Sequence, residues 1–80
     1  MERKTGEITE ADIDEFVSLC ESKNYHKQTV VAIGCLVSTY EAEDIFGSEI
    51  KALEFATEVV NESATEEDAF TIISRKITGD

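Results

Sequence analysis

Two cysteines and one histidine are the side chains best suited to metal or covalent chemistry in this sequence. Cys20, His26 and Cys35 follow one another at intervals of 6 and 9 residues, which fit no short-loop zinc pattern. Cys20 falls on the apolar stripe of an expected helix, and Cys35 lies in an apolar run, where thiols stay protonated and unreactive. We therefore predict no metal site, and we expect two buried, inert thiols that remain unpaired.

The carboxylates and glycines form no catalytic or phosphate-binding motif. General acid–base catalysis needs one desolvated acid, whereas nearly every Asp and Glu here lies on an expected polar helix face. The four glycines are scattered, so no glycine-rich phosphate loop is present, and no acidic cluster matches the calcium-loop pattern. We therefore predict that the protein is not an enzyme and binds no cofactor.

The segment Gly47–Phe55 resembles the part of acyl and peptidyl carrier proteins in which a serine carrying phosphopantetheine precedes a helix. Those carriers are also acidic helical bundles of similar length. When Ile50–Ala52 is matched to the family pattern, Glu49 occupies the position of the modified serine, so the attachment residue is missing. We interpret Ser48 as a helix N-cap, and a degenerate carrier-like protein is kept only as a further alternative.

Acidic residues dominate the charge of the chain. There are 18 Asp and Glu against 7 Lys and Arg, which gives a net charge of −11. Binding to nucleic acid requires clustered cations that neutralise phosphates, so we predict no direct contact with DNA or RNA. No apolar run is long enough to span a membrane, and no signal-peptide core follows Met1, so we expect a cytoplasmic protein that does not bind membranes.

Three glutamates follow one another at i, i+4 intervals in the most regular expected helix. Glu54, Glu58 and Glu62 repel one another at this spacing, so the row does not serve to stabilise the helix. Their spacing along the axis is about 6 Å, or roughly two nucleotide steps of a DNA strand, which suits a basic groove built for phosphates. We predict that this row binds a partner, and that acids of the first helix extend the surface, namely Glu10, Asp14 and Glu21.

These features together predict a small, non-enzymatic interaction protein. The most specific hypothesis is an inhibitor or regulator that binds a basic protein, for example one that handles nucleic acid. Nucleic-acid mimics and small phage-encoded counter-defence factors are of this kind. The alternative hypothesis is a helical regulator that docks through an apolar groove or forms a homodimer, with the acidity serving only solubility.

Signals for helix ends place all these residues in one helical domain. Helix N-termini are predicted at Thr9 with Asp12, Ser38 with Glu41, Ser48, and Thr65 with Asp68. Gly47 and Gly79 are predicted to end helices. We therefore predict an all-α, compact bundle of four to five short helices over residues 9–80, preceded by a disordered arm at residues 1–8.

The apolar run Thr29–Val37 fits either a buried helix or a buried strand. Its β-branched residues favour a strand, but no other segment alternates apolar and polar residues to pair with one. We predict a central buried helix, with Ala32 and Gly34 allowing close approach of its neighbours. An α+β fold with a strand near residues 29–37 is the alternative. The large side chains predicted to fill the core are Phe16, Ile33, Leu53, Phe55, Val60, Phe70 and Ile73.

Overall fold

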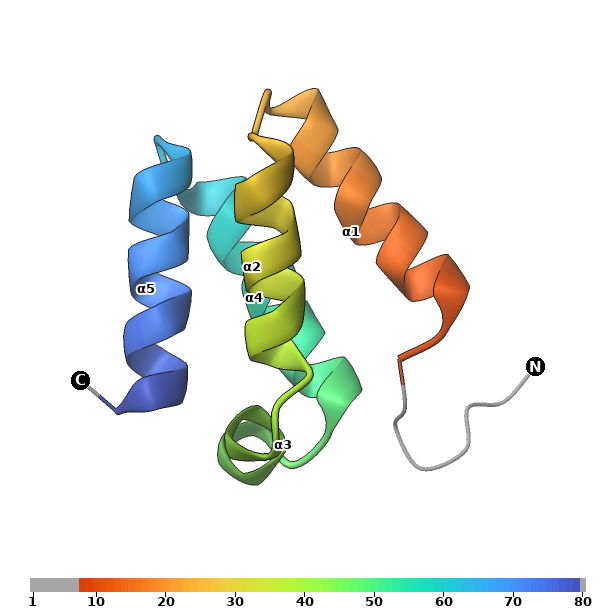
Figure 1. Cartoon of the computed structure of the whole chain (residues 1–80), viewed down its shortest axis with the longest axis vertical. Helices are drawn as coiled ribbons and strands as arrows, with labels where there is room; N and C mark the ends of the chain where they lie inside the picture. Colours follow the sequence, from red (N-terminus) through yellow and green to blue (C-terminus); the bar gives the residue numbers. More distant parts are fainter. Residues whose placement is uncertain (1–7, 80) are drawn as a thin grey trace.

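The computed structural model describes residues 8–79 and is all-α, which confirms the predicted fold class. Five helices make up this part of the chain: α1 (Glu10–Ser22), α2 (Lys27–Val37), α3 (Tyr40–Phe46), α4 (Glu49–Glu62) and α5 (Glu66–Thr78). In Figure 1, α2, α4 and α5 lie side by side, and α1 leans away from them toward its N-terminal end. None of these described helices is both long and apolar enough to cross a membrane.

The predicted arm lies almost entirely outside the described residues. Residues 1–7 are not described, whereas Ile8, which was also assigned to the arm, is half-buried and packs against the core. The backbone N–H of Ile8 lies 3.5 Å from a carboxylate oxygen of Glu49 at the start of α4. Ordered structure thus includes the residue before the first helix cap.

Local hydrogen bonds fix the N-termini of α1, α4 and α5 where the sequence predicts them. The Thr9 hydroxyl accepts from the Asp12 N–H at 3.3 Å, and the Asp12 carboxylate accepts from the Thr9 N–H at 2.9 Å, which completes a capping box. Ser48 and Thr65 cap α4 and α5 through one such bond each. Gly79 follows α5 in the left-handed conformation, with φ of 83°, which glycine adopts without strain.

The boundary between α2 and α3 lies one residue beyond the predicted capping box, so the assignment of Ser38 was wrong. Ser38 follows the last residue of α2, and its hydroxyl donates to the carbonyl oxygen of Gly34 at 2.9 Å. The Thr39 hydroxyl instead accepts from the Ala42 N–H at 3.1 Å and caps α3. Gly47 ends α3 in the left-handed region, with φ of 94°, as predicted.

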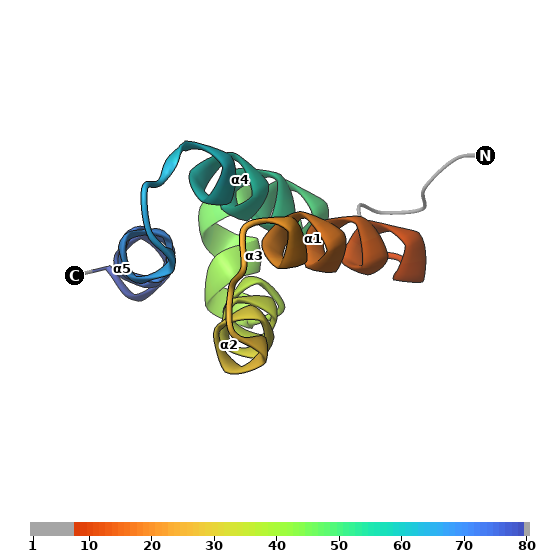
Figure 2. The ribbon, with the colours of Figure 1, turned by 90° about the horizontal axis from the view of Figure 1, so that it is seen from above.

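The apolar run is a helix, so the α+β alternative is wrong, but this helix is not central. In α2, Ile33 and Val37 are fully buried, whereas Val31 is 63% exposed and Cys35 is exposed. The neighbouring helices α3, α4 and α5 cover only one stripe of α2, and Figure 2 shows α2 at the edge of the molecule opposite α4. A methyl group added at Gly34 would meet no atom within 4 Å, so this glycine does not permit a close approach within the chain.

The central position belongs to α4, which contacts all four other helices. A helix with neighbours on several sides buries a wide arc of its surface. The fully or largely buried side chains of α4 are Ala52, Leu53, Ala56, Val59 and Val60.

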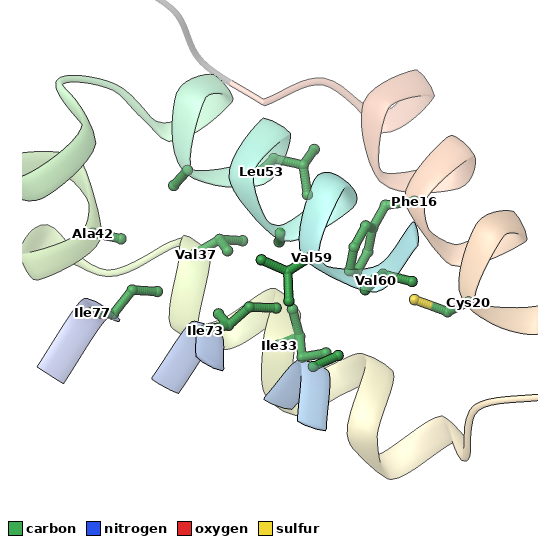
Figure 3. Close-up of a cluster of buried hydrophobic side chains, with 13 residues drawn as sticks. Phe16, Cys20, Ile33, Val37, Ala42, Leu53, Val59, Val60, Ile73 and Ile77 are labelled. Carbon is green, nitrogen blue, oxygen red and sulfur yellow. The ribbon is translucent and has the colours of Figure 1, made fainter. Parts of the chain in front are cut away.

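One cluster of buried side chains from all five helices forms the core (Figure 3). Five of the predicted core residues are at most 4% exposed, namely Phe16, Ile33, Leu53, Val60 and Ile73. The prediction was wrong for Phe70, which is 36% exposed, and for Phe55, which is half-buried and packs against Phe46 with ring centroids 5.0 Å apart. The helix α5 buries only the stripe of Ala69, Ile73 and Ile77, and Phe70 lies beside it.

Candidate functional site

A groove of about 670 Å³ runs between α1 and α4. The two helices run in the same direction, and α1 diverges from the bundle toward its N-terminus (Figure 1). The lining residues of α1 are Asp12, Glu15, Phe16 and Leu19, and those of α4 are Ile50, Leu53, Glu54, Thr57, Glu58 and Asn61. We call this feature the α1/α4 groove.

Two long-range hydrogen bonds tie α1 to α4 near the two ends of the α1/α4 groove. Before α1 begins, the Ile8 N–H approaches the Glu49 carboxylate. After α1 ends, the Lys23 ammonium lies 3.4 Å from the carbonyl oxygen of Asn61. Between these ties α1 and α4 pack against each other, and Phe16 and Leu53, which are 3% and 4% exposed, belong both to the groove lining and to the core.

The α1/α4 groove combines an apolar floor with acidic edges. Leu19 and Ile50 are half-buried and expose hydrocarbon surface in the floor, whereas Phe16 and Leu53 line it but are almost completely buried. Carboxylates stand on both sides, with exposed Glu15 on α1 and exposed Glu54 and Glu58 on α4. The buried carboxylate of Asp12 also lines the groove and is held in the capping box of α1.

No cation is among the described residues that line the α1/α4 groove, so every charged side chain in this lining is a carboxylate. The lining also contains no histidine, cysteine or serine, and its one hydroxyl, that of Thr57, donates to the Leu53 carbonyl oxygen at 2.8 Å. Nucleophilic catalysis requires an activated hydroxyl or thiol beside a base. The described residues that line the groove contain no such pair.

The predicted glutamate row of α4 divides between two surfaces. Glu54 and Glu58 line the α1/α4 groove, whereas Glu62 lines a second hollow, between α4 and α5, together with Val59 and Asp68. Positions four residues apart differ by about 40° around an α-helix, so a row of three such residues drifts sideways by about 80° over roughly two turns. At the end of α4 it is therefore Asn61, not Glu62, that continues the groove.

The acids predicted for α1 are all exposed but lie outside the α1/α4 groove. Glu10, Asp14 and Glu21 share a face of α1 that does not line it, and Glu15 is the exposed acid that α1 contributes instead. Sequence reasoning missed Glu15 because the helical wheel gives the position of the buried face but not the position of the neighbouring helix. The signal for it was its proximity to Asp12, Phe16 and Leu19 on the wheel.

The two thiols differ from each other, and one of them differs from the prediction. Cys20 is fully buried as expected, and burial, with the nearby charges of Glu21 and Glu66, raises its pKa to about 11. Cys35 is exposed, so the prediction of two buried thiols was wrong. Both are free, and no group of His, Cys, Asp and Glu in residues 8–79 has the arrangement of a metal site.

Ser48, the residue nearest to the carrier-protein motif, has a structural role that accounts for it. Its hydroxyl accepts from the Lys51 N–H at 3.3 Å and caps α4, as the sequence predicts.

No protein-family model matches the chain, and comparison with curated proteins and with solved structures finds no similar protein.

Proposed function

We propose that this protein is a non-enzymatic inhibitor or regulator that binds a basic amphipathic helix of another protein in its α1/α4 groove. The observation that carries the proposal is the apolar floor of Phe16, Leu19, Ile50 and Leu53 between carboxylates on both edges. A helix that enters such a groove buries an apolar stripe and places Lys or Arg beside the acids. The groove thus selects its partner by hydrophobic pattern and charge together.

The length of the α1/α4 groove suits a short helix. From Ile50 to Asn61, the lining of α4 spans 11 residue steps, or about 16 Å along the helix axis. A partner helix of about three turns covers this length and presents two or three apolar side chains on one stripe. Cations one turn apart then face Glu54 and Glu58, which are themselves one turn apart.

Electrostatics supports this partner class more than a nucleic-acid mimic. Mimicry of a phosphate strand calls for a continuous row of exposed carboxylates, whereas the row of α4 leaves the α1/α4 groove at Glu62. An apolar floor adds nothing to contacts with a phosphate-binding surface but gives affinity to an amphipathic helix. The net charge of −11 contributes mainly by attracting a basic partner before contact.

Nuclear magnetic resonance with a model ligand tests this proposal. The probe is a synthetic amphipathic helical peptide in which a leucine stripe is flanked by lysines, added to the isotope-labelled full chain. We expect the backbone signals of Leu19, Ile50 and Thr57 to shift most, because these residues line the α1/α4 groove. A peptide of the same charge with its leucines replaced by serine should bind more weakly. Shifts spread evenly over the acidic surface would contradict a defined groove.

A further inference from the structure

Lys27, at its first residue, is the one charged side chain of α2, and α2 lies at the edge of the molecule opposite α4 (Figure 2). Residues 28–40 contain no charged side chain, although 31% of the chain is charged. Every other described helix has at least three acidic residues, and α2 has none. For a molecule with a net charge of −11, α2 is therefore the helix along which a second copy meets the least electrostatic repulsion.

The same uncharged segment contains the two most exposed large apolar side chains of the described residues. Val31 is 63% exposed, and Tyr40, just beyond the end of α2, is 86% exposed. The other large apolar side chains at the surface are 36–47% exposed. Apolar area of this kind is stabilised when a partner covers it.

Gly34 lies in the interior of α2, where glycine weakens a helix relative to alanine. No contact within the chain requires it, because a methyl group at this position would meet no atom within 4 Å. With Cys35 beside it and Ser38 one turn later, Gly34 leaves a shallow surface over which another helix backbone can pass closely. A helix of another molecule packed against Gly34 explains why a glycine stands at this position, which the fold of the single chain does not explain.

We propose that two copies of this chain form a dimer through α2, with the two α2 helices antiparallel. A two-fold axis gives an isologous interface, which is the commonest form of homodimer. The antiparallel direction follows from charge: Lys27 begins α2, and Glu41 and Glu43 lie in the first turn of α3, just after α2 ends. Antiparallel pairing brings the cation of each copy near the acids of the other, whereas parallel pairing would place like charges together.

This dimer leaves the α1/α4 groove free, because none of the residues that line the groove belongs to α2. Each dimer therefore has two grooves, which would raise its avidity for a partner with two basic helices. The dimer itself does not depend on the function proposed for the groove, and the two proposals fail separately.

Sedimentation equilibrium of the full chain, with a reducing agent present, tests the dimer. We expect the apparent mass to rise from one chain toward two as concentration increases, and to rise no further. Val31→Glu introduces acids into the interface and should weaken the dimer about tenfold or more. Val31→Ala, which removes apolar area while favouring the helix, should weaken it severalfold. Ser18→Glu adds the same charge to an exposed position of α1 and should leave the dimer unchanged.

The native Cys35 thiol gives a second measurement on the same samples. Its reaction with a thiol reagent should slow as the concentration of wild-type protein rises, and should stay fast in Val31→Glu, because the dimer covers this exposed side chain. A wild-type protein that stays monomeric at all concentrations would overturn the proposal. So would a mass well above two chains, or a dimer that the two Val31 variants do not weaken.

Discussion

At the scale of single residues, Glu66 connects parts of the chain that are far apart in sequence. Its carboxylate accepts hydrogen bonds from the backbone N–H of His26 at 3.2 Å and from the Thr29 hydroxyl at 2.6 Å, and its contact with the His26 imidazole is 3.0 Å. The first residue of α5 thereby holds the first turn of α2. The bonds from Thr29 and His26 favour the ionised carboxylate and lower the pKa of Glu66 below its ordinary value of 4.5.

This lowered pKa predicts how the contribution of Glu66 to stability depends on pH. Near and below pH 4.5 the unfolded chain binds a proton at Glu66 more readily than the folded chain does, so acid favours unfolding at this site. The stabilisation is present above pH 4.5 and is lost as the pH falls through the pKa of the folded state. Urea unfolding should show that the difference in free energy between wild type and Glu66→Gln shrinks as the pH falls below about 4.5.

The control for this prediction is Glu67→Gln, which removes the same charge from the adjacent exposed residue. Glu67 makes none of the three contacts that Glu66 makes with His26 and Thr29. If Glu67→Gln gives the same pH-dependent difference as Glu66→Gln, general acidity of the chain rather than this hydrogen-bonded cluster is responsible.

At the scale of helices, the sequence predicts where elements begin and end better than how they pack. Helix ends depend on hydrogen bonds between residues a few positions apart, so they can be predicted from local spacing. This is true of the N-caps Thr9, Ser48 and Thr65, and of Gly47 and Gly79, which end α3 and α5. The position of α2 in the fold cannot be predicted in this way, because an apolar run does not show which of its faces will point into the core. That face is set by where α3, α4 and α5 lie, which depends on the whole chain.

Adjacent isoleucines of α5 test the packing of this helix. Ile73 is fully buried, whereas Ile72 is 47% exposed, although the two have the same side chain and helix propensity. Ile73→Ala should lower the free energy of unfolding by about 2–5 kcal/mol, since it leaves a cavity in the core. Ile72→Ala should change it by about 1 kcal/mol or less. Urea unfolding of the two variants measures this contrast, and equal losses would show that α5 faces the core in a different orientation.

At the scale of the whole molecule, the acids form distinct surfaces that a count of charges does not reveal. The packing of α1 on α4 places Glu15 in the lining of the same groove as Glu54 and Glu58, and it leaves Glu10, Asp14 and Glu21 outside. The sequence predicts that Glu54 and Glu58 lie on one surface, because a single helix contains both. It does not identify Glu15, because the pairing of two helices that are distant in sequence decides which acids meet.

The central claim, that the α1/α4 groove binds a basic amphipathic helix, is tested by two charge reversals of equal size. The double variant Glu54→Lys, Glu58→Lys changes the groove, and Glu10→Lys, Asp14→Lys makes the same change in net charge on the face of α1 outside it. Circular dichroism should show both variants folded, since all four positions are exposed. Calorimetric titration with the leucine–lysine peptide then compares their affinities at low salt.

We expect the groove variant to bind the peptide about tenfold or more weakly than wild type, because two attractive contacts become repulsive. The variant outside the groove should lose less than about threefold, since it changes only the long-range attraction that salt screens. Equal losses in the two variants would contradict the account, because the peptide would then be responding to the net charge of the protein and not to the α1/α4 groove.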